Sequence, residues 1–303
     1  MPTSQPRSTL RRTFYVLAAG VAVLGGLAAC SPLTALNALS PAGGATATTD
    51  IAYGSGERLK LDVYRPAKPA PGAPVVVFFY GGNWSMGERK DYAFVGRALA
   101  SRGIVAVIPD YRLYPQVKYP DFLDDSAQAV AWASKNIASY GGDPKSLFVM
   151  GHSAGAYNAA MVALDGRWLA KQGLAPNILA GWIGLAGPYD FLPIENENVK
   201  PVFHFPNTPV DSQPVNHLGG KKLPALLIAA NNDKLVNPKR NTGGLATSLR
   251  AQGVPVTEIY YDGVSHTTLV GSIAAPLRGL APTLDAVDQF VRNNASLSKV
   301  QAM

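Results

Sequence analysis

The sequence has very little cysteine and few charged side chains. Cys30 is the single cysteine among 303 residues, so no disulfide can form within the chain and the fold must be held by packing. Charged residues make up 16% and apolar residues 47%, which excludes a disordered or strongly solvated protein. Three of the 27 basic side chains lie in residues 1–29, which leaves 24 against 20 acidic ones, or +4. This charge is too mild and too scattered to predict a nucleic-acid partner.

Motifs for bound metals and cofactors are also missing. The four histidines do not cluster, and His204 and His217 are too isolated for a metal site. No phosphate-binding loop or dinucleotide fingerprint occurs in the right context. The sequence therefore predicts no metal and no cofactor.

The first 30 residues indicate an export signal. Arg11 and Arg12 precede an apolar stretch, Tyr15–Ala29, of roughly 15 residues, shorter than the ~20 that a spanning helix needs. Leu27-Ala28-Ala29-Cys30 resembles the bacterial lipobox, in which the cysteine is acylated and becomes the mature N-terminus. We expect residues 1–29 to be a lipoprotein signal peptide and Cys30 to anchor the protein to a membrane of a bacterial cell envelope. The alternative is an ordinary signal with Cys30 incidental, and both Sec and twin-arginine export stay open.

After Cys30 the composition divides the chain into three parts. Residues 30–50 are small, polar and rich in Pro and Gly, which predicts a flexible tether. A folded domain is expected over 51–295 and a tail over 296–303. Within the domain, strand-like apolar runs alternate with helical patterns. The predicted strands are Lys60–Tyr64, Val75–Tyr80, Ile104–Ile108, Leu147–Met150, Leu179–Leu185, Ala225–Ala230 and Thr257–Tyr261. The predicted helices are Asp91–Arg102, Asp121–Ser139, Ala154–Leu164, Thr242–Gln252 and Thr283–Asn293.

This alternation predicts an α/β fold with a mostly parallel sheet and helices on both faces. The runs Val75–Phe79 and Ile104–Ile108 are continuously apolar, as strands covered on both faces should be. Ligand sites in such sheets lie at the carboxyl ends of the strands. Residues 187–222 hold six prolines and no clear period, so we expect a small irregular lid or substrate loop there. A surface excursion without a role is the alternative.

Gly151-His152-Ser153-Ala154-Gly155 carries the strongest chemical signal. The Gly-x-Ser-x-Gly pattern is common, but here a buried strand, Leu147–Met150, precedes it and a helix-competent run, Ala154–Leu164, follows. A sharp strand-to-helix turn strains the backbone of Ser153 and exposes its hydroxyl above the sheet. A side chain at either glycine would strike the neighbouring strand or helix. Ser153 is therefore the predicted nucleophile.

Three further motifs give the chain a family resemblance. They are Tyr80-Gly81-Gly82-Asn83-Trp84, Asp110-Tyr111-Arg112-Leu113 and Tyr140-Gly141-Gly142-Asp143-Pro144. With the serine motif, they resemble the α/β-hydrolase superfamily, and within it the hormone-sensitive-lipase-like carboxylesterases with His-Gly-Gly-x-Trp. The resemblance runs from about Tyr53 to Arg292 and implies the α/β-hydrolase fold. It also implies that Asp110–Leu113 and Asp143 are scaffold.

The remaining catalytic residues follow from the chain order of this fold, which is Ser, then acid, then His. Only His266 leaves room for an acid, a helix and a strand before it, so it is the predicted general base. His152 adjoins the serine and is expected to point elsewhere. Asp233 ends a strand and is the favoured acid, with Asp190 as the rival. Asp262 is too close to His266 to reach the ring from the opposite side.

The resemblance also implies an oxyanion hole made by the backbone N–H groups of Gly82, Asn83 and Ala154. Tyr80 stands where relatives have histidine, and Asn83 where glycine is frequent. Two roles are open for Tyr80. It holds the loop from inside the protein, which we favour, or its hydroxyl helps to bind the oxyanion. Trp84 is expected to line the acyl pocket, with a purely core role as the alternative.

The sequence thus predicts a serine hydrolase that cleaves carboxylic esters through an acyl-enzyme. Short acyl chains or acyl groups on glycans suit a small irregular lid, so the expected partner is a small-molecule ester. An arylformamidase with the same triad, or a non-catalytic binding protein that keeps the fold, is the alternative. The acyl specificity and the oligomeric state stay open.

Overall fold

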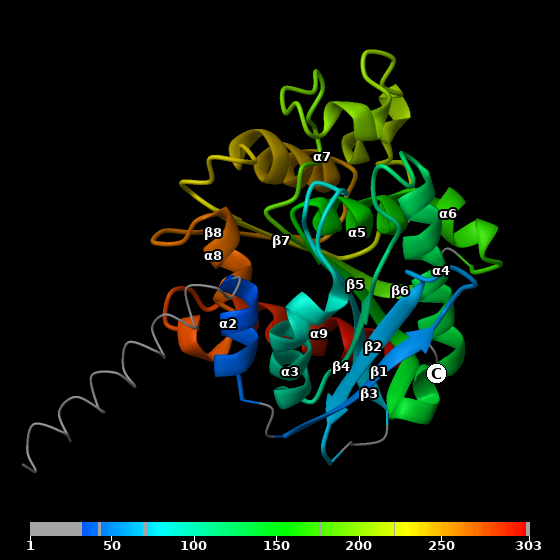
Figure 1. Ribbon diagram of the computed structural model, residues 1–303, viewed down its shortest axis with the longest axis vertical. Helices are drawn as coiled ribbons and strands as arrows, with labels where there is room; N and C mark the ends of the chain where they lie inside the picture. Colours follow the sequence, from blue (N-terminus) through cyan, green and yellow to red (C-terminus); the bar gives the residue numbers. More distant parts are fainter. Residues whose placement is uncertain (1–31, 42–43, 69–71, 176, 221, 301–303) are drawn as a thin grey trace, which may run out of the picture.

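The computed structural model describes residues 32–300 apart from 42–43, 69–71, 176 and 221 (Figure 1). The signal peptide, Cys30 and residues 301–303 lie outside the described residues. One eight-stranded sheet runs through the described part in the order β1-β2-β4-β3-β5-β6-β7-β8. Its strands are β1 Ala45–Ala52, β2 Lys60–Pro66, β3 Ala73–Phe79, β4 Val105–Pro109, β5 Gly142–His152, β6 Leu179–Leu185, β7 Ala225–Ala230 and β8 Val256–Tyr261.

Most of the sheet is parallel. The pairs from β4 through β3, β5, β6 and β7 to β8 are parallel, whereas β1 pairs with β2 and β2 with β4 in the antiparallel sense. The central strands β3, β4, β5 and β7 are almost wholly buried, because helices cover both faces and the continuous apolar runs suit such an environment. The α/β fold predicted from the sequence is confirmed.

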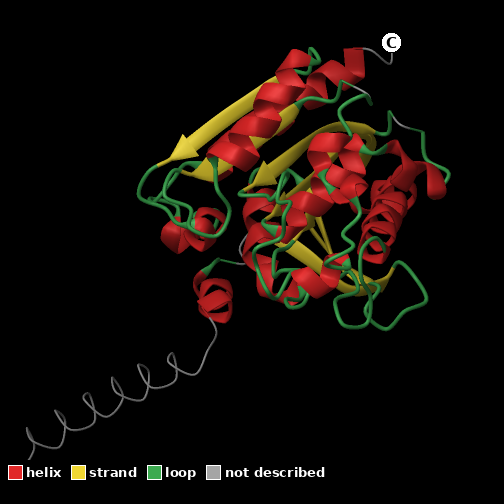
Figure 2. Cartoon of the chain, turned by 90° about the horizontal axis from the view of Figure 1, so that it is seen from above, coloured by secondary structure: helices red, strands yellow, loops and turns green. Residues whose placement is uncertain are grey.

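Helices cover both faces of this sheet (Figure 2). On one face α3 packs on β2 and β4, α9 packs on β5 and β6, and the two helices touch each other. On the other face α4 and α5 pack together against β3 and β5. The helices are α2 Pro32–Leu39, α3 Ala93–Ser101, α4 Asp121–Asn136, α5 Ala154–Leu164, α6 Gly166–Lys171, α7 Gly244–Ala251, α8 His266–Gly271 and α9 Thr283–Val300.

The short helical turns complete the described elements. They are η1 Arg89–Tyr92, η2 Ile137–Tyr140, η3 Lys200–Phe203, η4 Val210–Ser212, η5 Pro214–Asn216, η6 Lys239–Gly243 and η7 Ala275–Leu277. The predicted strand and helix cores are all present, with ends shifted by a few residues. Helices α6 and α8 were not predicted, because each has only six residues and shows no clear period.

The expected tether differs from the structure. Residues 32–39 form α2, and residues 45–52 form the edge strand β1. The side chain of Asn37 holds α2 against the domain, because its amide donates to Lys90 O (2.8 Å) and Asp91 O (3.0 Å) and its oxygen accepts from Phe94 N (2.9 Å). A flexible tether over the whole of 30–50 is therefore wrong. The expected tail is also helical as far as Val300, within α9.

Residues 187–222, the lid segment, lie at the top of Figure 1 and contain only the short turns η3, η4 and η5. The segment is nevertheless packed. Phe203 and Ser212 are fully buried, Tyr157 of α5 donates its hydroxyl to Ser212 O (2.7 Å), and Phe191 N donates to Gln213 Oε1 (2.8 Å). Side-chain packing and side-chain hydrogen bonds therefore order the lid segment in place of regular structure.

Candidate active site

Four segments that carry the predicted site residues begin at the carboxyl ends of strands. The loop with Gly82 and Asn83 follows β3, Ser153 follows β5, Asp233 follows β7 and His266 follows β8. Strands β3 and β5 are parallel neighbours, and so are β7 and β8. Because parallel strands end at the same edge of a sheet, the fold gathers these residues at one edge, as expected of ligand sites in such sheets.

Ser153 forms the turn between β5 and α5. Its backbone has φ +54° and ψ −122°, a conformation that is costly for a residue with a Cβ atom. Ser153 N donates to Leu185 O of β6 (2.9 Å), and Ser153 O accepts from Ala156 N (2.9 Å) and Tyr157 N (3.1 Å). These bonds hold the strained turn that the sequence predicts at the nucleophile.

Both glycines of the motif are required by close backbone contacts. A Cβ atom at Gly151 would lie 2.1 Å from Gly155 O, within the following helix. A Cβ atom at Gly155 would lie 2.0 Å from Phe79 O, in the neighbouring strand β3. Neither contact can be relieved by a side-chain rotation, since both partners are backbone atoms. The steric reason given for these glycines from the sequence is confirmed.

Asp233 and His266 form a buried pair. Nδ1 of His266 lies 2.7 Å from Asp233 Oδ2, and the two side chains are 8% and 1% exposed. Asp233 Oδ1 accepts from the backbone N–H groups of Leu235 (2.8 Å) and Val236 (2.9 Å). Burial opposes ionisation, but the hydrogen bond and charge of His266 and these two N–H groups together lower the pKa of Asp233. The carboxylate therefore stays charged at neutral pH.

The rival acids are engaged elsewhere. Asp190 forms a two-point ion pair with Arg240, at 3.0 Å from Nη2 to Oδ1 and 3.1 Å from Nε to Oδ2. Asp262 accepts a hydrogen bond from Asn231 Nδ2 (2.9 Å). The structure therefore brings Asp233, the acid favoured from the sequence, to His266.

The loop after β3 has an unusual backbone. Gly82, Asn83 and Trp84 have successive φ values of +130°, +52° and +55°. A Cβ atom at residue 82 would lie 2.2 Å from Met86 O, so only glycine fits there. In the described part of the chain, the N–H groups of Gly82 and Asn83 have no acceptor. The N–H of Ala154 opens α5, where the first N–H groups of a helix lack intrahelical partners.

Trp84 anchors this loop in the core. Its side chain is 2% exposed, and its indole N–H donates to Asn158 Oδ1 of α5 (2.9 Å). Tyr157 and Phe203 meet its ring edge to face, at centroid distances of 5.1 Å and 4.8 Å. Trp84 also lines the cavity in front of Ser153. Trp84 therefore both packs in the core and lines the cavity, which are the two roles considered for it from the sequence.

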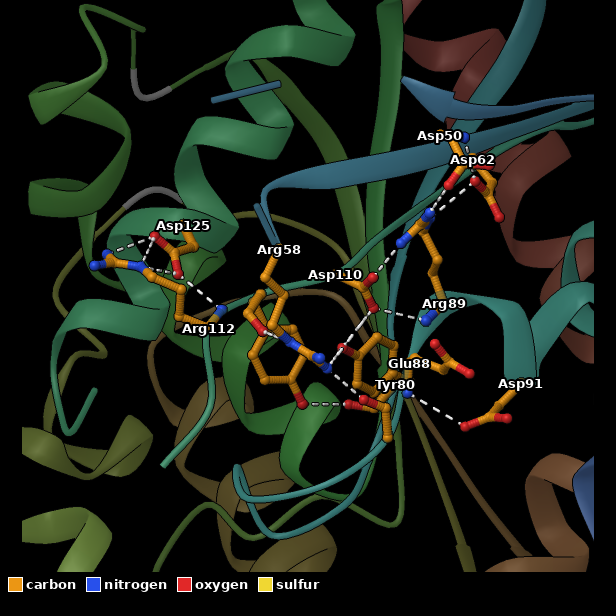
Figure 3. A network of polar contacts seen from close by, with 12 residues as sticks. Asp50, Arg58, Asp62, Tyr80, Glu88, Arg89, Asp91, Asp110, Arg112 and Asp125 are labelled. Carbon is orange, nitrogen blue, oxygen red and sulfur yellow. Dashed lines mark hydrogen bonds and ion pairs between the residues drawn. The ribbon is translucent and has the colours of Figure 1, made fainter. Parts of the chain in front are cut away.

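Tyr80 points into the protein (Figure 3). Its ring is fully buried between Tyr92 and Tyr111, and it does not line the cavity. Its hydroxyl donates to Asp110 Oδ1 (2.8 Å) and accepts from Arg58 Nη2 (2.9 Å). Burial, with the adjacent Tyr111 and Asp110, raises the pKa of Tyr80 well above its ordinary value, so the hydroxyl keeps its proton. This geometry agrees with the loop-holding role.

A buried arginine completes the support of the loop. Arg89 is 5% exposed and pairs with Asp50, Asp62 and Asp110, which come from β1, β2 and the end of β4 (Figure 3). Its backbone N–H also donates to Asp110 Oδ1 (2.7 Å). Burial alone favours the neutral form, but the hydrogen bonds and charges of Asp62 and Asp110 raise the pKa of Arg89. A buried charge is tolerated only when it is paired in this way.

A cavity of about 640 Å³ lies in front of the site. Gly82, Asn83, Ser153, Ala154 and His266 all line it, whereas Asp233 lies behind His266. The rest of its wall combines apolar and polar side chains and includes His152, Trp84, Phe191, Ile194, Val199, Leu235, Asp190, Glu195, Asn196, Asn237 and Arg240. Several of these come from the lid segment. The strand-end loops and residues 187–222 therefore share one cavity wall.

Two kinds of feature are absent from the described residues. No group of three or more His, Cys, Asp or Glu side chains there has the arrangement of a metal site. No helix among them has the length and apolar character needed to cross a membrane.

Comparison with known proteins identifies the family. The BD-FAE family model matches residues 61–247, which is more than half of the chain. The chain belongs to the BD-FAE family. A solved esterase from Pseudomonas putida is 28% identical to this BD-FAE family member, with a TM-score of 0.63 over 88% of this chain and 87% of that one. Esterase B from Lactobacillus rhamnosis, at 20% identity and a TM-score of 0.72, shows the shared α/β-hydrolase fold over 94% of this chain and 96% of the other.

Sequence relatives carry esterase names. A probable isoprenylcysteine α-carbonyl methylesterase of Oryza sativa is 29% identical over 256 residues, covering 76% of this chain and 58% of the relative. A probable carboxylic ester hydrolase of Mycobacterium tuberculosis, LipM, is 30% identical over 290 residues, covering 83% and 66%. The BD-FAE chain thus spans about three fifths of the length of the plant relatives that it matches.

Three residues that support the site, Arg58, Arg89 and Asn158, were not predicted from the sequence. Asn158 stands in an otherwise small and apolar helix, and that polar interruption is a signal that could have been used. Arg58 and Arg89 carry no such signal, because their partners come from distant strands. His152 was expected to point elsewhere, but its ring lies against that of His266, at a centroid distance of 4.9 Å.

Proposed function

We propose that this BD-FAE family member hydrolyses carboxylic esters with Ser153, His266 and Asp233 through an acyl-enzyme. One observation carries the proposal. A buried Asp233–His266 pair, 2.7 Å apart, adjoins the same cavity as a serine in a strained strand-to-helix turn. A serine hydroxyl is a weak nucleophile unless a base of this kind stands beside it. The esterase names of its relatives agree with this activity.

In the first step Ser153 Oγ attacks the ester carbonyl carbon. Nε2 of His266 takes the hydroxyl proton, and the carbonyl electron pair moves onto oxygen. Asp233 holds Nδ1–H of His266 and stabilises the imidazolium that forms, because its lowered pKa keeps it charged. The N–H groups of Gly82, Asn83 and Ala154 bind the oxyanion. Each such donor contributes on the order of 3 kcal/mol to the transition state.

In the second step the tetrahedral intermediate expels the alcohol, which leaves with the proton from His266. Ser153 then carries the acyl group as an ester. Water attacks this ester while His266 accepts its proton, and the acid product leaves as Ser153 regains its hydrogen. The α5 N-terminus beneath Ser153 favours negative charge in both steps, because the helix dipole is positive there.

The residues that line the cavity support the proposal that the substrate is an ester with a short acyl group and a polar alcohol part, such as an acylated glycan. Apolar contacts come from Trp84, Phe191 and Leu235, and hydrogen-bonding groups come from Asn196 and Asn237. The bound substrate would thus find both surfaces within one cavity of about 640 Å³.

We further propose that the protein works on the outside of a bacterial membrane, held by a lipid on Cys30. The Leu27–Cys30 motif after a basic and apolar segment supports this. Mass spectrometry of the protein purified from membranes tests it. A diacylglyceryl group on an N-terminal Cys30 is expected, and an unmodified N-terminus elsewhere would contradict the anchor.

A panel of 4-nitrophenyl esters with acyl chains from acetyl to palmitoyl tests the activity. An acetylated and a feruloylated oligosaccharide and N-formylkynurenine complete the panel. We expect the highest kcat/KM on short acyl esters and turnover of at least one acylated glycan. Preference for N-formylkynurenine would replace the proposal by an arylformamidase, and no turnover of any compound would favour a binding protein.

A further inference from the structure

Three of the four histidines bind a backbone carbonyl oxygen through Nε2. His152 binds His266 O (2.8 Å), His204 binds Tyr119 O (2.7 Å) and His217 binds Asp211 O (2.6 Å). A carbonyl oxygen only accepts hydrogen bonds, so Nε2 is the protonated nitrogen in each case. Of these three bonds, only that of His152 joins the nucleophile turn to the segment with the general base.

We infer that His152 is a positioning residue, whose Nε2–H holds the backbone of His266 at a fixed distance from Ser153. The inference rests on the proposed function, because it assigns a purpose to His152 only if Ser153 and His266 react together. His152 precedes Ser153 directly and is the last residue of β5, one of the two middle strands of the sheet. Its side chain thus begins at a rigid point of the sheet.

The segment that carries His266 needs such support. His266 opens α8, a helix of only six residues, and the preceding residues Asp262, Gly263 and Ser265 are exposed. Asp233 fixes the rotation of the imidazole through Nδ1, but this bond does not fix the main chain that carries the ring. The bond from His152 to His266 O does. These two contacts, one to the ring and one to the backbone, act together with the Ser265 cap of α8 and the buried Val264 in placing the base.

The ring of His152 also meets the oxyanion loop. It is 4% exposed, and a Cβ atom at Gly81 would lie 3.2 Å from His152 Nδ1 and 3.0 Å from Ser153 Cβ. Glycine at position 81 therefore lets the loop close on the nucleophile turn. His152 lies where the three catalytic segments meet, beside Gly81, Ser153 and His266. A shift of its ring would disturb all three.

The charge state of His152 suits this place. Burial and the adjacent His266 lower the pKa of His152 to about 3. The ring is therefore neutral when His266 takes the proton of Ser153, and no second positive charge opposes the imidazolium. Nδ1 of His152 is buried and has no hydrogen-bond partner among the described residues, which agrees with an unprotonated nitrogen packed against a glycine.

Three variants test the inference. His152→Leu removes the donor and keeps an apolar side chain, and His152→Gln offers an amide N–H in place of Nε2–H. Ser272→Ala is the matched control, because it removes the buried hydrogen bonds of the Ser272 hydroxyl with Leu269 O (2.7 Å) and Thr283 Oγ1 (2.7 Å), at the opposite end of α8 from His266. The kinetics use 4-nitrophenyl acetate, and a fluorophosphonate probe reports the reactivity of Ser153.

We expect His152→Leu to lower kcat by about 100-fold with KM within about threefold, since misplacement by about 1 Å costs that much. The kcat of His152→Gln should be about tenfold higher than that of His152→Leu. Ser272→Ala should keep kcat within about twofold of the wild-type value. The labelling rates should follow kcat. A folded His152→Leu or His152→Gln enzyme with wild-type kcat would overturn the inference, as would equal losses of kcat in Ser272→Ala. If wild-type protein itself neither turned over the ester nor reacted with the probe, the proposed function would fail instead.

Discussion

Tyr80 shows how a residue next to the proposed oxyanion loop acts through its neighbours. The Tyr80 hydroxyl donates a hydrogen bond to Asp110, and Arg58 donates a second hydrogen bond to the Tyr80 hydroxyl oxygen. Arg58 Nε also donates to Tyr111 O (2.8 Å), while Tyr111 donates its own hydroxyl to Tyr80 O (2.8 Å). The last residue before Gly81 is thereby fixed through both side chain and backbone, and the loop starts from a rigid point.

Tyr80→Phe distinguishes this support from direct binding of the oxyanion. The variant keeps the stacked ring and leaves Asp110 and Arg58 with one partner fewer. We expect a loss of about 1–3 kcal/mol in the free energy of unfolding and kcat within about threefold. A hydroxyl that bound the oxyanion would instead cost about 100- to 1,000-fold in kcat. Urea unfolding and steady-state kinetics on one preparation measure both quantities.

His152 should make the fold sensitive to acid. Its ordinary pKa of 6.5 falls to about 3 in the folded protein, so between these values the unfolded chain binds a proton that the native state does not. Stability therefore rises with pH across this window and is lost as pH falls, at up to about 1.4 kcal/mol per pH unit for one proton. The lowered pKa of Asp233 has the same sign at lower pH.

Unfolding free energies of wild type and His152→Gln between pH 4 and pH 7 check this effect. We expect the variant to depend less steeply on pH, by about one proton, because glutamine does not titrate. The other histidines and Asp233 are common to both proteins and cancel in the comparison. Identical slopes would show that His152 does not contribute to the acid sensitivity.

At the scale of an element, the loop of residues 82–84 is held in an unfavourable backbone conformation. Positive φ values at Asn83 and Trp84 cost about 1–3 kcal/mol each and persist only where the surroundings impose them. The buried bond from the Trp84 indole to Asn158 and the aromatic rings around it supply that restraint. The N–H groups of Gly82 and Asn83 are thereby left pointing at no acceptor of the described chain.

Asn158→Leu should loosen this loop. The change leaves the buried indole N–H of Trp84 without its acceptor, so we expect a loss of about 1–3 kcal/mol in stability. We also expect kcat to fall about tenfold, since the oxyanion donors are less well placed. Asn136→Leu is the control, because the Asn136 side chain bonds only to Trp132 O of its own helix and is exposed. Equal kcat values for the two variants would show that the Asn158 side chain does not hold this loop in place.

The elements themselves were predictable where local pattern and packing agree. The continuous apolar runs Val75–Phe79 and Leu226–Ala230 predict strands buried on both faces, and both lie in internal strands of the sheet. The Thr-rich strand β1 and helix α2 were not predictable, because their partners are distant. Backbone atoms of β2 pair with β1, and Lys90, Asp91 and Phe94 bind Asn37 of α2. No local composition encodes such contacts.

At the scale of the whole molecule, part of the candidate site could likewise be predicted from local sequence, and part depends on contacts between distant segments. Ser153 could be found from its five-residue motif, and His266 by elimination among four histidines, because the fold fixes the order of the segments. The sequence favoured Asp233 over Asp190, but only the geometry shows that Asp233 contacts His266 and that Asp190 pairs with Arg240. The cavity wall needed it too, because the lid segment contributes side chains from an aperiodic stretch.

The described part of the molecule is thus a mostly parallel sheet whose strand ends hold a serine and a histidine at one cavity, with an acid behind the histidine. The α2 segment packs against η1 and α3, so the domain begins almost directly after the residues that lead from Cys30. An anchor at Cys30 would hold the domain close to the membrane surface.

The most direct measurement of the central claim is covalent labelling of wild type and Ser153→Ala with a fluorophosphonate probe, followed by peptide mass spectrometry. The account predicts one probe per wild-type chain, on the peptide that contains Ser153, with loss of ester hydrolysis in proportion to labelling. It predicts no labelling of Ser153→Ala and a fall in kcat of at least about 1,000-fold. Undiminished labelling of Ser153→Ala, or a modified residue elsewhere in the active wild-type enzyme, would contradict it.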